Sequence, residues 1–488
     1  MTVGPELALV IPLVGAVGIG LTGSKPNLRE AVTLLCAATL LGCVSLIAAQ
    51  VLQGEHPRWE GPLMGPGLQL VLEVEPLGLL YAMVGAVLWI PNSIYSIGYM
   101  RGHHERNQTR FYICFALALS SVMGIAFSGN LPTLFVFYET LTLSTFPLIA
   151  HHGSPQAKRS GRIYLGILFS TSMLFLLLGI CWAGVANGGD LSFKAGGILG
   201  GVDPGVRSVL FVLFVLGIGK AALMPFHFWL PAAMVAPTPV SALLHAVAVV
   251  KAGVFCMLKI MLYVFGLDVV RDQVHHEWLM SLAAFTILVS SIVALNQDNL
   301  KARLAYSTVS QLSYIVLGAS LGSVLGILGG GLHVAMHATG KITLFFCAGA
   351  IYVAAGKTKV SQLDGLGRSM PVTMGCFAVG AMSIIGLPPL GGAWSKWYLG
   401  LATLDSAWPW LLAVLMVSSL LNVAYLMPIP IRAFFLPPPS GGPEPSGIQE
   451  APLPCLIAMV ITAILSLLLF FAPELALALP ELALGGKL

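Results

Sequence analysis

Apolar stretches long enough to cross a lipid bilayer follow one another from end to end of this chain. A bilayer-spanning helix needs about 17 to 25 mainly apolar residues. Only 9% of the 488 residues are charged, against about 25% in an ordinary globular chain. Because a helix satisfies its own backbone hydrogen bonds inside lipid, the chain is predicted to be an all-α polytopic membrane protein. A soluble enzyme is excluded.

A helix-length hydropathy window predicts about fourteen transmembrane helices. They are expected near residues 6–23, 31–52, 76–99, 111–128, 131–150, 161–187, 206–230, 237–264, 278–297, 302–321, 325–355, 371–400, 408–431 and 452–480. The stretches 53–68 and 437–451 are rich in proline and glycine and are predicted to be loops.

The placement of positive charge predicts the orientation of the chain. An even number of spans puts both termini on one side of the membrane. When residues near span ends are counted with the adjacent face, the face after odd-numbered spans holds fourteen of the 24 lysines and arginines and the opposite face six, and four lie deep inside spans. Since cytoplasmic loops carry the excess of positive charge, both termini are expected to lie outside.

The residues that most constrain function are the titratable groups inside the predicted spans. A charge at the middle of a bilayer costs at least about 2.5 to 3.5 kcal/mol, so it needs a reason to be there. Burial disfavours the charged amine, which prepares a lysine to release and regain a proton. The groups are Glu139, Lys220, Lys251, Lys341 and Lys396, with the histidines His245, His333 and His337.

Structural explanations of the same residues stay open. Glu139 and Lys220 could form a static buried ion pair that fixes helix register. His333, His337 and Lys341 recur every fourth residue and therefore share one helix face. The two histidines could be core residues or metal ligands. They could not both be axial ligands of one haem, because they lie one turn apart on one helix.

Helix breakers stand beside two of the lysines. Pro225 follows Lys220 by five positions, and Pro388 and Pro389 precede Lys396. Pro237 begins the span that follows Pro225. Interior prolines remove backbone hydrogen bonds, and lipid tolerates this only where protein or a water-filled cavity receives the freed groups. Spans 7 and 12 are therefore predicted to be discontinuous helices of the kind that form ion sites in transporters.

Other chemistry is not supported by the sequence. The eight cysteines contain no CxxC pair, and neither a nucleotide-binding loop nor a Ser/His/Asp set is present. No cofactor, metal or nucleic acid is expected, and this chain is not expected to hold a redox centre. Whether it forms part of a redox-driven translocase stays open.

Several stretches resemble one known family of membrane proteins. MPFHFWLPAAMVAPTPVSALLHAVAVVKAGVF, DNLKARLAYSTVSQLSYI, HATGKITLFF and GLPPLGGAWSKWYL follow one another between about residues 110 and 400. They resemble the antiporter-like proton-channel subunits shared by respiratory complex I, Mrp-type cation/proton antiporters and membrane-bound hydrogenases. The last stretch, with no further spans expected after the fourteenth, is most similar to the D subunit of the Mrp-type antiporters.

The resemblance implies an architecture and a set of roles. The architecture is three N-terminal helices in residues 1–110, two inverted five-helix repeats in 111–264 and 278–432, and a last helix and tail in 452–488. By motif, Glu139 and Lys220 resemble the family's Glu–Lys pair. Lys251 resembles the next relay lysine, the stripe from His333 to Lys341 resembles the central axis, and Lys396 matches the terminal position.

The leading functional hypothesis is proton movement along a hydrated path at the membrane midplane. The family implies partners: other membrane subunits of a bacterial or archaeal antiporter or respiratory complex, protons, Na⁺ as a second candidate ion, and the lipid bilayer. A complex I or hydrogenase subunit is the nearest alternative. A non-conducting scaffold and a membrane protein binding haem or quinone are the alternatives from other classes.

Overall fold

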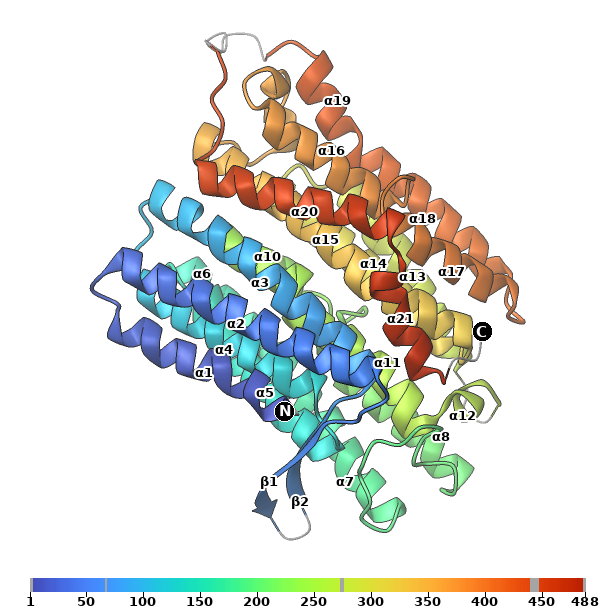
Figure 1. Ribbon diagram of the computed structural model, residues 1–488. Helices are drawn as coiled ribbons and strands as arrows, with labels where there is room; N and C mark the ends of the chain where they lie inside the picture. Colours follow the sequence, from blue (N-terminus) through green and yellow to red (C-terminus); the bar gives the residue numbers. More distant parts are fainter. Residues whose placement is uncertain (1–2, 66–67, 273–275, 439–446, 486–488) are drawn as a thin grey trace.

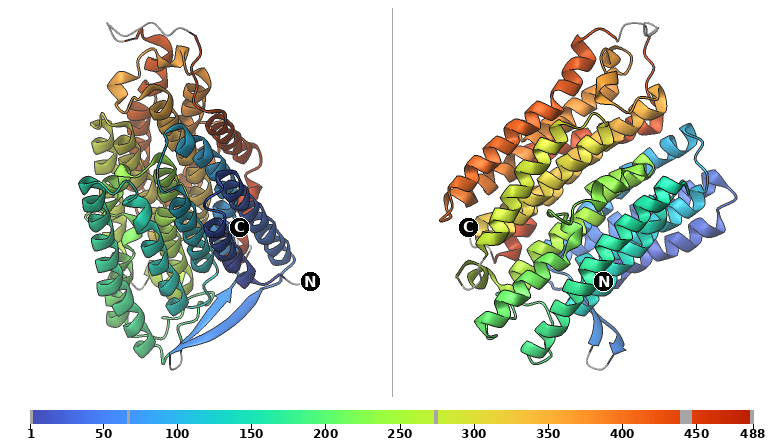
Figure 2. Two further views of the ribbon diagram at one scale, coloured as in Figure 1. Left: turned by 90° about the vertical axis from the view of Figure 1, so that its left-hand side faces the viewer. Right: turned by 180° about the vertical axis from the view of Figure 1, so that it is seen from behind.

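The computed structural model of the chain describes residues 3–65, 68–272, 276–438 and 447–485. Its helices lie side by side in one bundle, with a β-hairpin at the end where the first helix begins and the last helix ends (Figure 1). Figure 2 shows that the blue to green helices and the orange to red helices form two adjoining sets.

The helices and strands of the first set cover the described residues up to 272. They are α1 Pro5–Leu21, α2 Pro26–Leu52, β1 Arg58–Gly65, β2 Leu68–Glu73, α3 Pro76–Gly102, α4 Gln108–Ala126, α5 Leu131–Ile149, α6 Pro155–Thr171, the π-helix η1 Ser172–Leu176, α7 Leu177–Ala186, α8 Pro204–Gly217, the 3₁₀-helix η2 Gly219–Ala221, α9 Trp229–Ala232, η3 Ala233–Val235, α10 Thr238–Ala246, α11 Val249–Ile260, the π-helix η4 Met261–Phe265 and α12 Leu267–Asp272.

The second set begins at residue 277. It contains α13 Glu277–Leu295, α14 Leu300–Ser320, α15 Val324–Ala355, the 3₁₀-helices η5 Val360–Gln362 and η6 Leu366–Arg368, α16 Pro371–Ile385, α17 Gly392–Leu404, α18 Trp410–Leu426, α19 Pro428–Phe435, α20 Leu453–Phe471 and α21 Glu474–Ala483.

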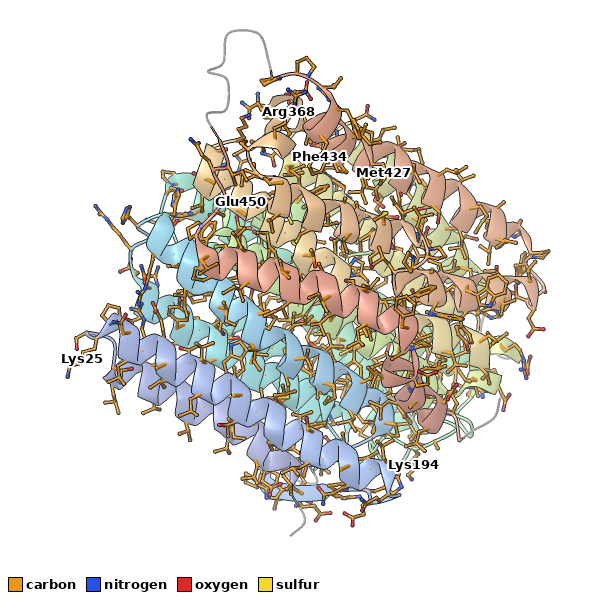
Figure 3. The ribbon with its side chains drawn as sticks, turned by 45° about the horizontal axis from the view of Figure 1, so that its top comes forward. Lys25, Lys194, Arg368, Met427, Phe434 and Glu450 are labelled. Atoms are coloured by element: carbon orange, nitrogen blue, oxygen red, sulfur yellow. The ribbon has the colours of Figure 1, made fainter. Side chains whose placement is uncertain are left out.

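Nine helices within the described residues are long and apolar enough to cross a membrane. Some of them join consecutive labelled segments, as in Pro155–Ala186 and Thr238–Phe265. Three shorter apolar helices, α1, α8 and α16, lie among them. Basic Lys25 and Lys194 lie at opposite ends of the bundle (Figure 3), so the polar loops cap both ends of the apolar helices.

Helix α15 is the centre of the bundle. It packs against α3, α10 and α11 of the first set and against α14, α16, α17 and α20 of the second. Every residue from Gly326 to Ile351 is buried, which is the pattern of a helix enclosed by protein on all sides. The stretch 329–331 is three glycines, and a Cβ at Gly329 would lie 2.8 Å from the backbone nitrogen of Leu399.

The predicted loop at 53–68 is wrong in its second half, and the all-α prediction is correspondingly incomplete. Strands β1 and β2 pair antiparallel from Arg58 opposite Glu73 to Gly65 opposite Leu68. The second strand is anchored on the bundle, because the Val71 nitrogen donates to Thr133 Oγ1 at 2.9 Å and the Gly129 nitrogen donates to the Val71 carbonyl at 2.9 Å. The class is therefore a helical membrane bundle with one hairpin.

Two further predicted spans have different bounds. The prediction for 452–480 joined two helices that the structure separates, since α20 ends at Phe471 and Pro473 stands before α21. Proline lacks the backbone N–H that would continue the first helix. The prediction for 237–264 treated as continuous a segment that is interrupted at Val247 and Ala248, between α10 and α11.

Both predicted helix breaks are present. Span 7 divides after Gly217 and becomes helical again at η2 and α9, and span 12 divides between Ile385 and Gly392. At the second break the two halves approach very closely, because a Cβ on Gly392 would lie 1.9 Å from the Ser383 carbonyl oxygen. Glycine is therefore the residue that allows α17 to start where it does.

We predict that Gly392→Ala destabilises the protein by about 1 to 3 kcal/mol, because the added methyl group forces backbone atoms apart. The measurement is the thermal unfolding midpoint of the purified protein in detergent. Gly42→Ala is the matched control, since Gly42 lies inside α2 with no atom within 4 Å of an added Cβ. It should be neutral or slightly stabilising. Equal midpoints for the two variants would contradict this packing.

Candidate functional site

Lys220 lies in the break of the seventh predicted span and is fully buried. Its ammonium group donates to the Tyr138 carbonyl at 2.8 Å and to Thr142 Oγ1 at 2.7 Å. The same nitrogen sits 3.1 Å from the centre of the Tyr138 ring. Helix α5 thus supplies a carbonyl, a hydroxyl and an aromatic face, which together replace part of the water that a lysine loses on burial.

Glu139 does not form the direct ion pair with Lys220 that the sequence allowed. Its side chain is buried, and neither carboxylate oxygen has a hydrogen-bond partner among the described residues. The residue lies on α5 between the two residues that hold Lys220, so its negative charge acts on the lysine across space rather than by contact. A buried carboxylate in this state needs water or a partner beyond this chain.

The polar groups freed at the Lys220 break are satisfied by protein. The Gly219 carbonyl accepts from Trp229 Nε1 at 3.1 Å, and the backbone nitrogen of Lys220 donates to the Tyr138 hydroxyl at 3.1 Å. Helix α11 lies directly against the break, because a Cβ on Gly253 would lie 2.2 Å from the Lys220 carbonyl carbon. The break is a fixed, packed element of the fold.

Lys251 lies in the first turn of α11, just after the interruption that the sequence did not reveal. The Ala248 carbonyl at that interruption accepts from the Tyr81 hydroxyl at 2.9 Å. The fully buried Lys251 Nζ lies 2.7 Å from His337 Nδ1. The direction of this hydrogen bond depends on which nitrogen carries the proton, so the pair can hold one proton at either residue.

The predicted stripe on α15 is confirmed as one buried face. The rings of His337 and His333 are 5.6 Å apart, and His333 Nδ1 lies 2.8 Å from Ser395 Oγ on α17. The His333 ring also stacks on Tyr314 at 5.7 Å. The stripe therefore connects α11, through the two imidazoles, to the second broken span.

Lys341 continues the stripe and is also fully buried. Its nitrogen donates to Ser307 Oγ at 2.6 Å, and the same oxygen accepts from the Tyr425 hydroxyl at 2.9 Å. The Tyr425 hydroxyl oxygen also lies within hydrogen-bonding distance of the side-chain oxygen of Asn422, so its one proton is shared between the Ser307 and Asn422 oxygens. A chain of hydroxyl groups thus leads from the lysine on α15 toward α18.

Lys396 lies in α17, four residues after the second break ends. Its ammonium group donates to the Ile385 carbonyl at 2.9 Å and to Ser419 Oγ at 3.1 Å. Ile385 is the last residue of α16, so the lysine fills a carbonyl that the break has freed. The same nitrogen lies 5.0 Å from the Tyr314 ring, on which His333 stacks.

The structure brings five of the seven predicted primary residues into one line and leaves two apart. The line begins with the contact of Lys251 with His337, whose ring lies beside that of His333. Both His333 and Lys396 contact the Tyr314 ring, and Lys341 lies one turn from His337. Glu139 and Lys220 form a separate group. Pro225, Pro388 and Pro389 lie in the two breaks, and Pro237 caps α10. His245 belongs to α10, but its side chain is outside the described residues.

One buried ion pair was not predicted from the sequence. Lys259 lies near the end of the predicted span 237–264 and is one of the six basic residues counted on the terminal face. Its side chain is fully buried and forms a salt bridge with Glu75, the residue before α3. Lys259 also donates to the Ser128 carbonyl at 2.7 Å. The position of Lys259 on the same helix as Lys251, eight residues later, was the available signal.

A second unpredicted cluster lies in the loops opposite the hairpin. The buried carboxylate of Glu105 lies 3.0 Å from His103, 3.5 Å from His152 and 4.0 Å from His151. Burial lowers the pKa of His151, and the nearby Glu105 opposes that shift. Among the residues that the structure describes, no group of three or more His, Cys, Asp or Glu is arranged to hold a metal ion.

We predict that Thr142→Val destabilises the protein by about 1 to 3 kcal/mol, because the buried ammonium of Lys220 loses one of its two acceptors without any change of shape. Thr140→Val is the control on the same helix, since its hydroxyl is exposed and bonds only to the Val136 carbonyl. Thermal unfolding in detergent measures both. An equal effect of the two variants would show that the Thr142 hydroxyl does not hold the lysine.

The chain was compared with known families and proteins. The family described as NADH:quinone oxidoreductase/Mrp antiporter, TM matches residues 128–422. The chain is 35% identical over 460 residues to the N subunit of the NADH-quinone oxidoreductase of Desulforudis audaxviator, covering 92% of this chain and 89% of that one. It is 27% identical to the D subunit of the Na⁺/H⁺ antiporter of Alkalihalophilus pseudofirmus, covering 88% and 86%.

A solved structure has the same fold. A chain of the Mrp complex from Dietzia sp. DQ12-45-1b superposes with a TM-score of 0.86 at 22% identity, covering 99% of this chain and 97% of that one. The family match includes both broken spans and all seven primary site residues. The chain therefore belongs to the NADH:quinone oxidoreductase/Mrp antiporter transmembrane family.

Proposed function

We propose that this chain carries protons along the middle of the membrane by way of Lys220, Lys251, the α15 stripe and Lys396. The observation that supports the proposal is the chemistry of the lysine partners. Three of these lysines are fully buried and Lys396 is half-buried. Each contacts carbonyls, hydroxyls or an imidazole, and none contacts a carboxylate among the described residues. Such a lysine can lose its proton without leaving a bare buried anion beside it.

Glu139 is proposed to control the first step. Its negative charge favours a proton on Lys220 while the carboxylate is ionised and near. Neutralising or moving Glu139 removes that attraction, and Lys220 then gives its proton toward Lys251. The two lysines have no direct contact in the described structure, so water must bridge them. From Lys251 the proton passes to the imidazole of His337.

The second half of the path is proposed to work by exchange between adjacent groups. His337 and His333 can each take a proton on one nitrogen and release one from the other. Lys341 lies one turn away and Lys396 shares Tyr314 with His333. Protonated amines in one low-dielectric path repel each other, so a proton that enters at one end favours release at the other.

The architecture we propose is fourteen crossing segments with both termini outside. It adds to the nine long helices the three shorter apolar helices and the helices α5 and α14, of 19 and 21 residues. Residues 111–264 and 278–432 would form two inverted repeats, between the N-terminal helices of 1–110 and the last helix in 452–488. In each proposed repeat a broken span carries a lysine near the break, fully buried at Lys220 and half-buried at Lys396.

The parent assembly is proposed to be a multisubunit membrane complex. The higher identity to the N subunit of an NADH-quinone oxidoreductase, 35% against 27% for the D subunit of an Na⁺/H⁺ antiporter, favours a redox-driven complex over the D-type antiporter expected from the motifs. The D-type assignment is the second candidate. It requires that proton exchange depend on Na⁺, which a Na⁺ titration of the purified complex in vesicles tests directly.

We predict that Lys220→Ala abolishes proton exchange, detected as the decay of an imposed pH difference in vesicles containing the assembled complex. Lys194→Ala is the control, because Lys194 is an exposed lysine paired with Asp190 in a loop. Assembly of both variants is checked by size-exclusion chromatography. Undiminished exchange in an assembled Lys220→Ala complex would refute the relay and favour a scaffold role.

A further inference from the structure

The ion pair between Lys259 and Glu75 has no part in the relay described above. The Lys259 side chain is 0% exposed and the Glu75 side chain 12% exposed. Lys259 is held further by the Ser128 carbonyl and by the Phe193 ring, whose centre lies 4.4 Å from the lysine nitrogen. The Tyr263 side chain lies beside Glu75 and lines the same cavity. Lys259 is therefore enclosed by protein, and the pair is partly exposed only at Glu75.

That open side faces a cavity of about 820 Å³. The cavity lies at the end of the bundle with the hairpin, between the start of α3, the end of η4, α12 and α21. Its charged lining residues are the acids Glu73, Glu75, Asp268 and Asp405 and the base Arg271, and His56 is the histidine among the lining residues. Arg271 is paired with Asp268 at 3.1 Å, and Glu73 is paired with Arg58 at 3.5 Å. A cavity of this size holds many water molecules, and carboxylates at its wall attract cations and protons.

Helix α11 joins this cavity to the relay. Lys259 lies eight residues after Lys251, which is about 12 Å along a helix. Phe255 lies between them, with its ring 5.6 Å from the Lys259 nitrogen and stacked on Tyr81 at 4.9 Å. Tyr81 in turn holds the interruption just before Lys251. Cys256 lies close enough to Lys220 and to Lys259 to feel the charge of both.

We propose that the Lys259–Glu75 pair is a proton-exchange site that connects the relay of the first broken span with an aqueous vestibule, the acidic cavity, on the terminal side of the membrane. The inference rests on the proposed function. The ligand of the site is a proton carried by water, and the acidic wall raises the local concentration of hydronium and other monovalent cations.

In each cycle of the exchange one proton enters from the relay and one proton leaves to the cavity. In the resting pair Lys259 is an ammonium and Glu75 a carboxylate. Lys259 passes its proton to Glu75, which makes both groups neutral and avoids a separated buried charge. Glu75 releases that proton to water in the cavity, and the Lys259 amine takes the next proton from the relay side, which restores the ion pair. Uptake from the vestibule runs through the same steps in reverse.

A paired neutral substitution tests the proposal. Glu75→Gln with Lys259→Gln removes both titrations but keeps a hydrogen-bonded pair of similar size, so the fold is kept. The control is Asp364→Asn with Arg432→Gln, which neutralises a pair at 2.7 Å that lies away from the cavity. In vesicles with the assembled complex, proton exchange should fall at least tenfold in the first variant and stay within twofold in the control.

Exchange within twofold of the unchanged protein in the assembled Gln/Gln variant would overturn the proposal, because a purely structural pair would be replaced by this substitution. Lys220→Ala is measured in the same preparation to separate two failures. If Lys220→Ala abolishes exchange and the Gln/Gln variant does not, the vestibule is wrong and the relay stands. If Lys220→Ala has no effect, the proposed function itself fails.

Chemical labelling tests the vestibule without changing the ion pair. Ala195 is exposed and lines the cavity, and Val185 is exposed outside it on α7. Each is changed to cysteine in a Cys181→Ser background, since Cys181 is an exposed thiol. A membrane-impermeant cationic thiosulfonate added to the terminal side should block exchange in the Ala195→Cys complex and not in Val185→Cys. Unchanged exchange after complete labelling of Ala195→Cys would overturn the vestibule.

Discussion

A buried ammonium group surrounded by lipid-facing helices must recover the hydrogen bonds that water gave it, and this requirement organises the structure. The four predicted relay lysines recover them from groups that carry no charge. At Lys396 the acceptor is the carbonyl of Ile385, which is available only because α16 ends there. The helix break and the lysine therefore satisfy each other. Either one alone would leave a buried polar group without a partner.

Lys220 meets the same requirement in a different way. The groups freed at its own break are taken by Trp229 and by the Tyr138 hydroxyl, and the ammonium turns to the carbonyl and hydroxyl groups of α5. The carbonyl that accepts from it belongs to Tyr138, the neighbour of Glu139. A shift of α5 would therefore change the hydrogen bonds and the electrostatic environment of Lys220 together.

The main features of this arrangement could be predicted from the sequence because each has a local signal. Span length follows from apolar runs, the breaks from Pro225 and Pro388, and the α15 stripe from a four-residue repeat. The interruption at Val247 and Ala248 has no such signal, because no proline or glycine marks it and a tertiary bond from Tyr81 stabilises it. The sequence also does not predict which hydroxyl groups accept hydrogen bonds from the lysines. Serines and threonines are common in apolar helices, and only the packing of the helices brings particular ones to a lysine.

The errors have the same cause. Lys259 stands near the end of the predicted span 237–264, where a lysine is expected to reach the membrane surface, and its ion pair with the distant Glu75 makes it a core residue. The prolines and glycines of residues 53–68 predict a loop, whereas the hairpin forms because its second strand is held by Thr133 and Gly129. Both are contacts between segments far apart in sequence, which a hydropathy window does not detect.

The uninterrupted course of α15 has a consequence for timing. His333, His337 and Lys341 belong to a single 32-residue helix that carries no break, whereas α11 and α17, which face them, each begin at one. The backbone positions of the three groups are therefore fixed relative to one another by one helix. A displacement of α15 along its axis would therefore alter the contacts to Lys251, Ser395 and Ser307 together.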